Sequence, residues 1–282
     1  MKKLATLSIC LGSAVAAATA GVSPEVITPA ASSGWVGDVN LQLNYARLDG
    51  NPVSSPEEDE YSSAYLEFQI GRDFGNYFVQ ADVFGEMTDA EGSDNNYSDG
   101  FGTAVHVLRQ TNFGGVGVFG GGFTTQQDQN SERLFAGLEA QLNRNEADYY
   151  FQLGYLFLGG HGKDEDSINR AIFGRVVAQT ELTKCLSLSG EFGGARGQMD
   201  SDHDNVTILN AGVALNQKIN DSLVASLSYD YIRYDQGGEN DLLNEHIFGL
   251  GLTYSFGAGS SATTLSTPRF LRWSGITGGQ LE

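Results

Sequence analysis

The segment Asp38-Val-Asn-Leu-Gln-Leu-Asn-Tyr45 alternates strictly between apolar and polar residues. Successive side chains of a β-strand point to opposite faces, so Val39, Leu41, Leu43 and Tyr45 share one face. The acidic and amide side chains share the other face. One face of this strand therefore suits hydrocarbon and the other suits water.

The same period-2 pattern occurs about twelve times, bounded by turn residues. The pattern is weakest in the fifth and eighth segments. The expected strands are 38–45, 65–70, 77–84, 101–109, 115–124, 133–142, 148–157, 170–180, 185–195, 206–217, 223–233 and 245–256. Each approaches the roughly 9–11 residues that a tilted strand needs to cross a bilayer. The pattern predicts an all-β fold, an antiparallel transmembrane β-barrel of about 12 strands, spanning residues 35–256.

The connections between these segments alternate between long and short. The long ones are mostly acidic, at 46–61, 86–99, 124–132, 158–168, 196–205 and 234–244. The short ones are 71–76, 110–114, 143–147, 181–184 and 218–222. Short periplasmic turns and longer extracellular loops are typical of outer-membrane barrels. An even strand count then predicts that both termini are periplasmic. A soluble sandwich also has alternating strands but predicts no such alternation of loop length.

The first 20 residues have the pattern of a secretory signal peptide: Lys2 and Lys3, an apolar run, and Ala18-Thr-Ala20 before the expected cleavage point. A lipoprotein anchor at Cys10 is the competing interpretation, but Ile9 does not fit the small residue required before it. Residues 21–34 would then form an N-terminal periplasmic segment. No later stretch has 18 consecutive apolar residues, so no transmembrane helix is expected.

Charge excludes one class of partner. Removing the two signal-peptide lysines leaves 14 basic residues against 35 acidic ones, a net charge of −21. Such an acidic chain does not bind nucleic acid through phosphate contacts. Without Cys10, Cys185 is alone, so neither an intrachain disulfide nor a cysteine metal cluster is expected.

The last segment, His246-Ile-Phe-Gly-Leu-Gly-Leu-Thr-Tyr-Ser-Phe256, resembles the closing strand of bacterial outer-membrane β-barrel proteins of the porin-like class. This resemblance implies a location in the cell outer membrane. It also implies that Tyr254 and Phe256 form the aromatic signal read by the barrel assembly machinery. In that class the aromatic residue usually ends the chain, whereas here residues 257–282 follow.

The polar face of the strands predicts what lines the lumen. The expected pore-lining charges are Asp38, Glu67, Asp82, Glu139, Arg175, Glu191, Asp230 and Glu245. An excess of carboxylates in a narrow aqueous passage favours cations. Alternatively, each acid pairs with a nearby Arg or Tyr and only fills the interior. Small inward residues on the late strands leave room on one wall, for water, a loop or the C-terminal tail.

The tail has a charge opposite to that of the barrel. Residues 257–264 resemble a flexible linker, and Arg269 and Arg272 follow in an apolar context. We expect this tail to dock at the periplasmic mouth or to bind a periplasmic partner; a disordered tail is the alternative.

No catalytic residue, metal site or cofactor is predicted. The loop motifs Asp200-Ser-Asp-His-Asp204 and His161-Gly-Lys-Asp-Glu-Asp166 place carboxylates beside histidine, as water-activating sites do. The full pattern of omptin-type membrane proteases is absent, however. His246 and His106 have no adjacent serine that would indicate an outer-membrane phospholipase. Position six of the loop beginning at Asp200 is Asn205 rather than Gly, so it is no EF-hand.

The predicted function is therefore a narrow porin-like channel for small cationic or neutral solutes. The alternatives are a plugged interaction barrel that presents acidic loops, and an outer-membrane hydrolase. The acidic loops would lie beside lipopolysaccharide, where bridging divalent cations would limit repulsion.

Deleting residues 257–282 tests whether the tail docks. We expect the deletion to change single-channel conductance and the pattern of protease cleavage, because a docked basic segment would cover part of the mouth. Unchanged conductance together with an unchanged cleavage pattern would contradict docking.

Overall fold

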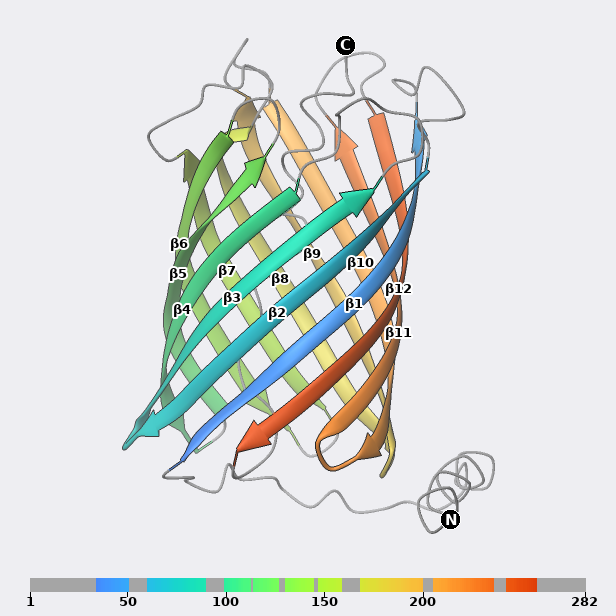
Figure 1. The fold of residues 1–282 in the computed structure, drawn as a ribbon. Coiled ribbons are helices and arrows are strands. Elements are labelled where there is room, and N and C mark those ends of the chain that lie inside the picture. Colours follow the sequence, from blue (N-terminus) through green and yellow to red (C-terminus); the bar gives the residue numbers. More distant parts are fainter. Residues whose placement is uncertain are drawn as a thin grey trace.

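The computed structural model describes nine stretches of the chain, which form one closed barrel (Figure 1). They are residues 34–50, 60–89, 99–112, 114–126, 130–144, 147–158, 168–199, 205–235 and 242–257. The expected signal peptide, nearly all of the expected segment 21–34, and the tail after Gly257 lie outside the described residues. So do most of the residues in the expected long loops.

The expected twelve strands are confirmed, including the weakly patterned fifth and eighth. They are β1 (Trp35–Gly50), β2 (Glu60–Phe74), β3 (Tyr77–Asp89), β4 (Asp99–Thr111), β5 (Gly114–Gln126), β6 (Asn130–Asn143), β7 (Asp148–Leu158), β8 (Ile168–Thr183), β9 (Leu186–Met199), β10 (Asn205–Asn220), β11 (Leu223–Asp235) and β12 (Leu242–Gly257). Among the described residues, no helix is long and apolar enough to cross a membrane.

The strands are longer than predicted. They contain 11 to 16 residues, whereas the expected segments contain 6 to 12. For example, β1 continues to Gly50 and β2 begins at Glu60, although 46–61 was expected to be a loop. Antiparallel pairing continues through these residues because each strand offers its neighbour an unbroken row of backbone partners. The ladders therefore extend beyond the hydrophobic segments on which the sequence prediction was based.

Every strand pairs antiparallel with its neighbours in the chain, and β12 pairs with β1 to close the sheet. Following paired residues from Trp35 around the sheet leads back to Asp49, 14 residues further along β1. This stagger with twelve strands gives a tilt of about 40° and a backbone radius of roughly 12 Å. A barrel of that radius has room for inward side chains and a narrow central space.

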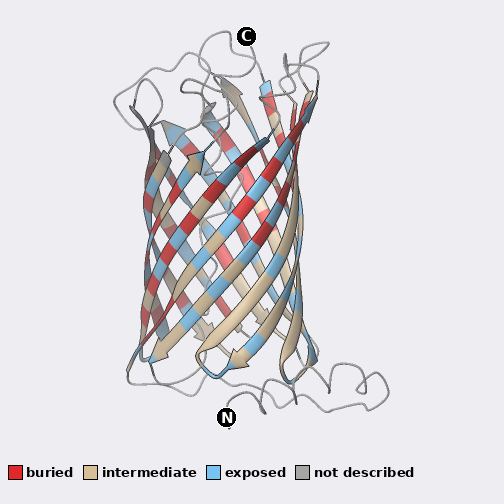
Figure 2. Cartoon of the chain, turned by 45° about the vertical axis from the view of Figure 1, so that its right-hand side comes forward, coloured by how far each residue is buried: buried red, intermediate tan, exposed pale blue. Residues whose placement is uncertain are grey.

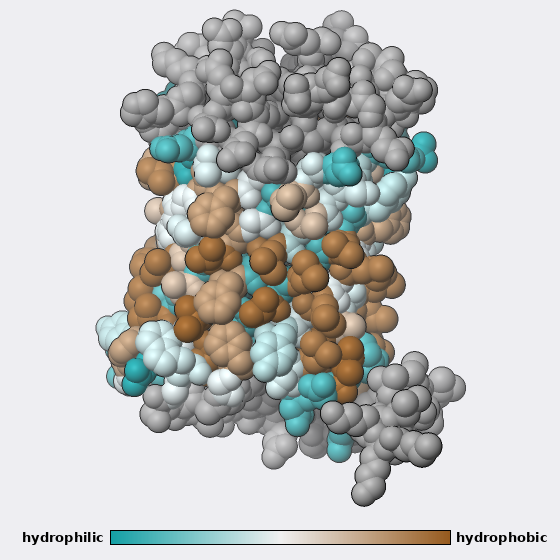
Figure 3. Space-filling view, in the orientation of Figure 1, coloured by the Kyte–Doolittle hydropathy of each residue, from teal (hydrophilic) through white to brown (hydrophobic). Residues whose placement is uncertain are grey.

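The outward face is apolar across the middle of every strand. Figure 3 shows this as a brown band, with teal side chains above and below it on the face in view. The most exposed large apolar side chains of the band include Leu66, Leu138, Leu153, Phe192 and Leu250. Outward charged side chains of the described residues lie only near the strand ends. This is the arrangement required to contact hydrocarbon.

The closing seam is covered by an aromatic ring. Phe256 on β12 lies over Gly37 of β1, where a Cβ atom would clash with the ring. The ring also stacks on Phe68 of β2, with ring centroids 5.9 Å apart. Tyr254 is exposed on the outward face of the same strand. The glycine thus lets an aromatic side chain bridge β12, β1 and β2 at the turn end of the barrel, where the short connections lie.

A charge placed in the middle of the apolar band should destabilise the barrel. Leu138→Arg should cost about 2–4 kcal/mol of unfolding free energy in lipid vesicles. Met87→Arg, two residues before the loop end of β3, should cost about 0–1 kcal/mol, because a charge there reaches water. Reversible denaturant unfolding measures both variants. Equal costs would contradict the membrane-spanning arrangement.

Candidate functional site

The barrel interior is where the polar side chains converge. All eight residues predicted to line it lie on inward-facing positions. Asp38, Glu67, Asp82, Glu139, Arg175 and Glu245 are buried, whereas Glu191 and Asp230 are half-buried. The structure also brings in residues that the prediction missed or left unassigned: His106, Gln152, Glu86 and Arg133.

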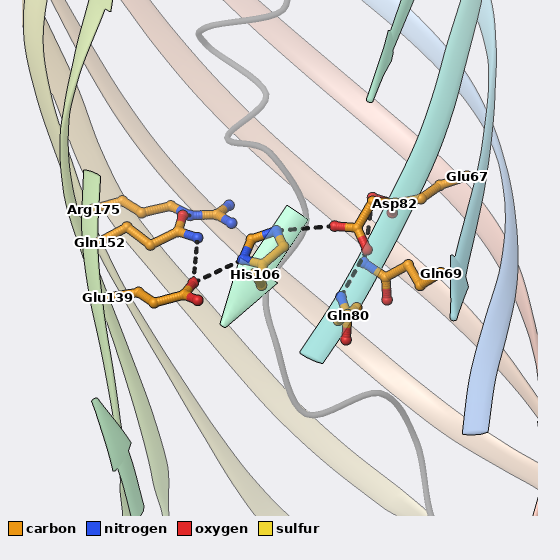
Figure 4. A network of polar contacts seen from close by, with 8 residues as sticks. All are labelled: Glu67, Gln69, Gln80, Asp82, His106, Glu139, Gln152 and Arg175. Carbon is orange, nitrogen blue, oxygen red and sulfur yellow. Dashed lines mark hydrogen bonds and ion pairs between the residues drawn. The ribbon is translucent and has the colours of Figure 1, made fainter. Parts of the chain in front are cut away.

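A polar network follows the inner wall of the barrel from β3 to β9, and Figure 4 shows its central part. Its centre is His106 on β4, whose Nε2 lies 3.1 Å from Asp82 Oδ2 on β3 and whose Nδ1 lies 2.9 Å from Glu139 Oε2 on β6. Gln80 donates to Asp82 at 2.8 Å. The histidine thus joins carboxylates from strands on either side of its own.

The network continues from Glu139 toward β9. Gln152 on β7 donates to Glu139 at 3.3 Å, and its carbonyl accepts from Arg175 Nε at 2.9 Å. Arg175 on β8 then forms an ion pair with Glu191 on β9, 3.2 Å apart. The four strands β6 to β9 therefore each contribute one residue to a continuous row of polar contacts: an acid, an amide, a base and a second acid.

His106 is fully buried, and its ring stacks on Phe119 with centroids 5.8 Å apart. Each ring nitrogen faces a carboxylate oxygen, and both nitrogens can donate together only when the imidazole is protonated. The geometry is that of one cation compensating two buried anions. The sequence did not place His106 on a face, because Ala104 and Leu108 make the inward face of this strand nearly as apolar as the outward one.

The loop-end half of the interior, which is the half nearer the long loops, is largely apolar. Buried apolar side chains fill inward positions there, and on the late strands Figure 2 shows buried residues mainly toward the loop end. The cluster includes Phe84, Phe123, Phe135, Phe173, Leu156, Ile208, Ile232 and Ile247. These side chains pack against one another inside the barrel. Their apolar surface is thereby removed from water, which is favourable. Period-2 alternation predicts the direction of these side chains but not the polarity of the interior.

Glu245 belongs to this apolar region, where it is 1% exposed. Its two carboxylate oxygens accept hydrogen bonds from the hydroxyls of Tyr61 and Tyr234. The hydroxyl donors stabilise a buried carboxylate whose directly paired residues, Leu48 and Ile232, are apolar. Glu245 is therefore a packed interior acid, in contrast to the partly accessible Glu191.

The late strands form a different kind of wall. Small inward residues on β9 to β12 retain intermediate exposure, among them Ser187, Ser189, Ala214, Ser226, Ser228, Gly251 and Thr253. Inward residues on β2 to β5 are mostly large and buried, including Tyr65, Phe78 and Phe119. Small inward side chains with accessible surface are thus characteristic of the β9–β12 wall.

The described residues contain no group of three metal-binding side chains. Both acidic loop motifs considered as hydrolytic sites lie outside the described residues. His246 faces outward, and its Nδ1 lies 2.9 Å from the Tyr229 hydroxyl. The residues directly across from it are Arg47 and Tyr231, so the register places no serine opposite the ring. This gives no support to a phospholipase-type arrangement at His246.

The sequence matches no protein-family model and no curated protein. Solved structures share the fold. The COG4313 outer-membrane channel from Pseudomonas putida F1 is 11% identical, aligned over 84% of this chain and 100% of that one, with a TM-score of 0.58. The NanC porin is 11% identical over 76% of this chain and 98% of that one, with a TM-score of 0.53. The fold is therefore that of bacterial outer-membrane β-barrels.

Removing the central histidine should destabilise the barrel strongly. His106→Ala leaves Asp82 and Glu139 buried without their cation, at a cost of about 3–5 kcal/mol. The triple variant D82N/H106Q/E139Q removes all three charges and should recover most of that stability. Denaturant unfolding in vesicles compares the two. A triple variant no more stable than H106A would show that charge compensation is not the role of His106.

Proposed function

We propose that this protein is an outer-membrane channel for passive passage of small cationic or neutral solutes. In this proposal the long loops face outside and both termini are periplasmic. The outward apolar band and the closed barrel support a membrane location, since lipid offers backbone groups no hydrogen-bond partners. Tyr254 and Phe256 are the residues proposed to be read by the assembly machinery.

The observation that carries the channel proposal is the asymmetry between the two walls. Large buried side chains pack the β2–β5 wall, whereas serines, glycines and alanines on the β9–β12 wall keep accessible surface. A barrel of roughly 12 Å backbone radius filled evenly by large side chains would leave no such surface. A passage along β9–β12 accounts for it.

The charge next to this passage supports a cation preference. The side chain of Glu191 is 23% exposed although it pairs with Arg175. On the described strands, inward carboxylates outnumber inward basic side chains, of which His106, Arg133 and Arg175 are all buried. A low-dielectric wall focuses the field of such acids on the water between them.

The apolar loop-end cluster limits what can pass. Its buried side chains narrow the interior above the polar network, so the passage is proposed to be selective for small solutes. The same cluster favours the second candidate, a plugged barrel that acts through its surface loops. Single-channel recording of the purified full chain separates the two: steady conductance supports the channel, and its absence supports the plug.

Neutralising the accessible acid should reduce cation selectivity. Glu191→Gln should lower the cation-to-anion permeability ratio by roughly twofold or more, because the field along the passage loses one of its accessible anions. Glu132→Gln is the matched control, since it removes one negative charge from an exposed outward position on β6. Reversal potentials in a salt gradient give both ratios. Identical shifts in the two variants would contradict a passage beside Glu191.

A further inference from the structure

The loop-end rim of the outward face has a basic arc and an acidic arc. Exposed outward arginines lie near the loop ends of four strands: Arg170 on β8, Arg196 on β9, Arg233 on β11 and Arg47 on β1. Outward acids on the remaining strands, Glu60 on β2, Asp89 on β3 and Glu132 on β6, also lie near the loop ends of their strands. Positive charge is thus collected on one side of the barrel.

Strand register brings the members of the basic arc close together. Arg170 lies directly across from Gln198, so Arg196 is its diagonal neighbour, at about 7–8 Å between Cα atoms. Arg233 is in the same way diagonal to His246, which lies directly across from Arg47. The arc therefore has two basic groups, one on β8 and β9 and one on β11, β12 and β1, separated by β10.

Each of these arginines has five N–H donors, and Arg170 uses two of its own within the barrel wall. Arg170 donates from Nε and Nη2 to the Gln198 carbonyl, at 3.0 and 2.6 Å, which holds its guanidinium on the surface. Salt bridges between described residues involve none of the four arginines. Glu60, across from Arg47, marks the edge of the arc, and Asp49 and Asp235 lie above it toward the loops.

Directly below the arc the surface is apolar. Ile172 and Phe192 are exposed beneath the first group, and Phe248 and Leu250 beneath the second. Tyr229 packs against Phe248, with ring centroids 5.1 Å apart. A ligand for this surface combines negative charge at the boundary with hydrocarbon chains below it. Arg groups bind phosphate through paired, charge-assisted hydrogen bonds.

We propose that Arg170, Arg196 and Arg233 form a binding site for the phosphate groups of the phosphorylated glycolipid of the outer leaflet, with its acyl chains against the apolar surface below. The site rests on the proposed outer-membrane placement with loops outward. It goes beyond bulk lipid contact because it assigns one side of the barrel to one lipid class.

The test measures binding of purified bisphosphorylated lipid A to the full chain in neutral detergent, by native mass spectrometry. R170Q/R196Q/R233Q should bind about tenfold more weakly than the unsubstituted chain. R109Q/R144Q/K184Q is the matched control, because it removes three exposed positive charges at the turn end. This control should bind within about twofold of the unsubstituted chain.

Two further probes identify the ligand chemistry. Dephosphorylated lipid A and phosphatidylglycerol should both bind more weakly than bisphosphorylated lipid A. Equal binding of phosphatidylglycerol would overturn the assignment to the glycolipid, and equal weakening in the two triple variants would overturn the site. Conductance is recorded separately, so a silent barrel that still binds lipid A would contradict only the channel.

Discussion

Backbone hydrogen bonding in lipid is the constraint on which this structure depends. No group in hydrocarbon can pair with a free N–H or C=O, and each one left unpaired costs several kcal/mol. An open sheet would expose two such edges, whereas pairing β12 with β1 leaves none. The 14-residue stagger from Trp35 to Asp49 follows from closing twelve tilted strands. Closure also separates an inside from an outside, and every functional feature is placed by that separation.

The two faces then follow different rules. The outward band excludes charge because a charge there cannot reach water, and charges such as Arg170 and Arg196 appear only at the strand ends. The interior tolerates both polarities because side chains can pair with one another. His106 between Asp82 and Glu139, and Glu245 between Tyr61 and Tyr234, are two solutions to burying carboxylates. The first supplies a cation and the second supplies neutral donors.

The proposed passage follows from unequal side-chain volume around the ring. Large groups such as Phe119 and Tyr65 pack the early wall, while Ser226 and Gly251 on the late wall leave surface accessible. Above them the apolar cluster around Phe135 and Phe173 restricts the interior. A part of the wall that is filled by large side chains leaves no room for solutes. The position of the small inward residues therefore decides where solutes could move.

The sequence by itself determined the approximate strand number, the direction of most strand side chains and the apolar outer band, because period-2 alternation is a local property of extended backbone. For this reason Asp82, Glu139 and Arg175 were correctly placed facing inward. Only the tertiary structure decided which inward groups meet. His106 reaches both Asp82 and Glu139 because register and stagger bring β3, β4 and β6 to one height. The apolar loop-end cluster likewise arises from packing across the barrel, and alternation along a single strand carries no information about the opposite wall.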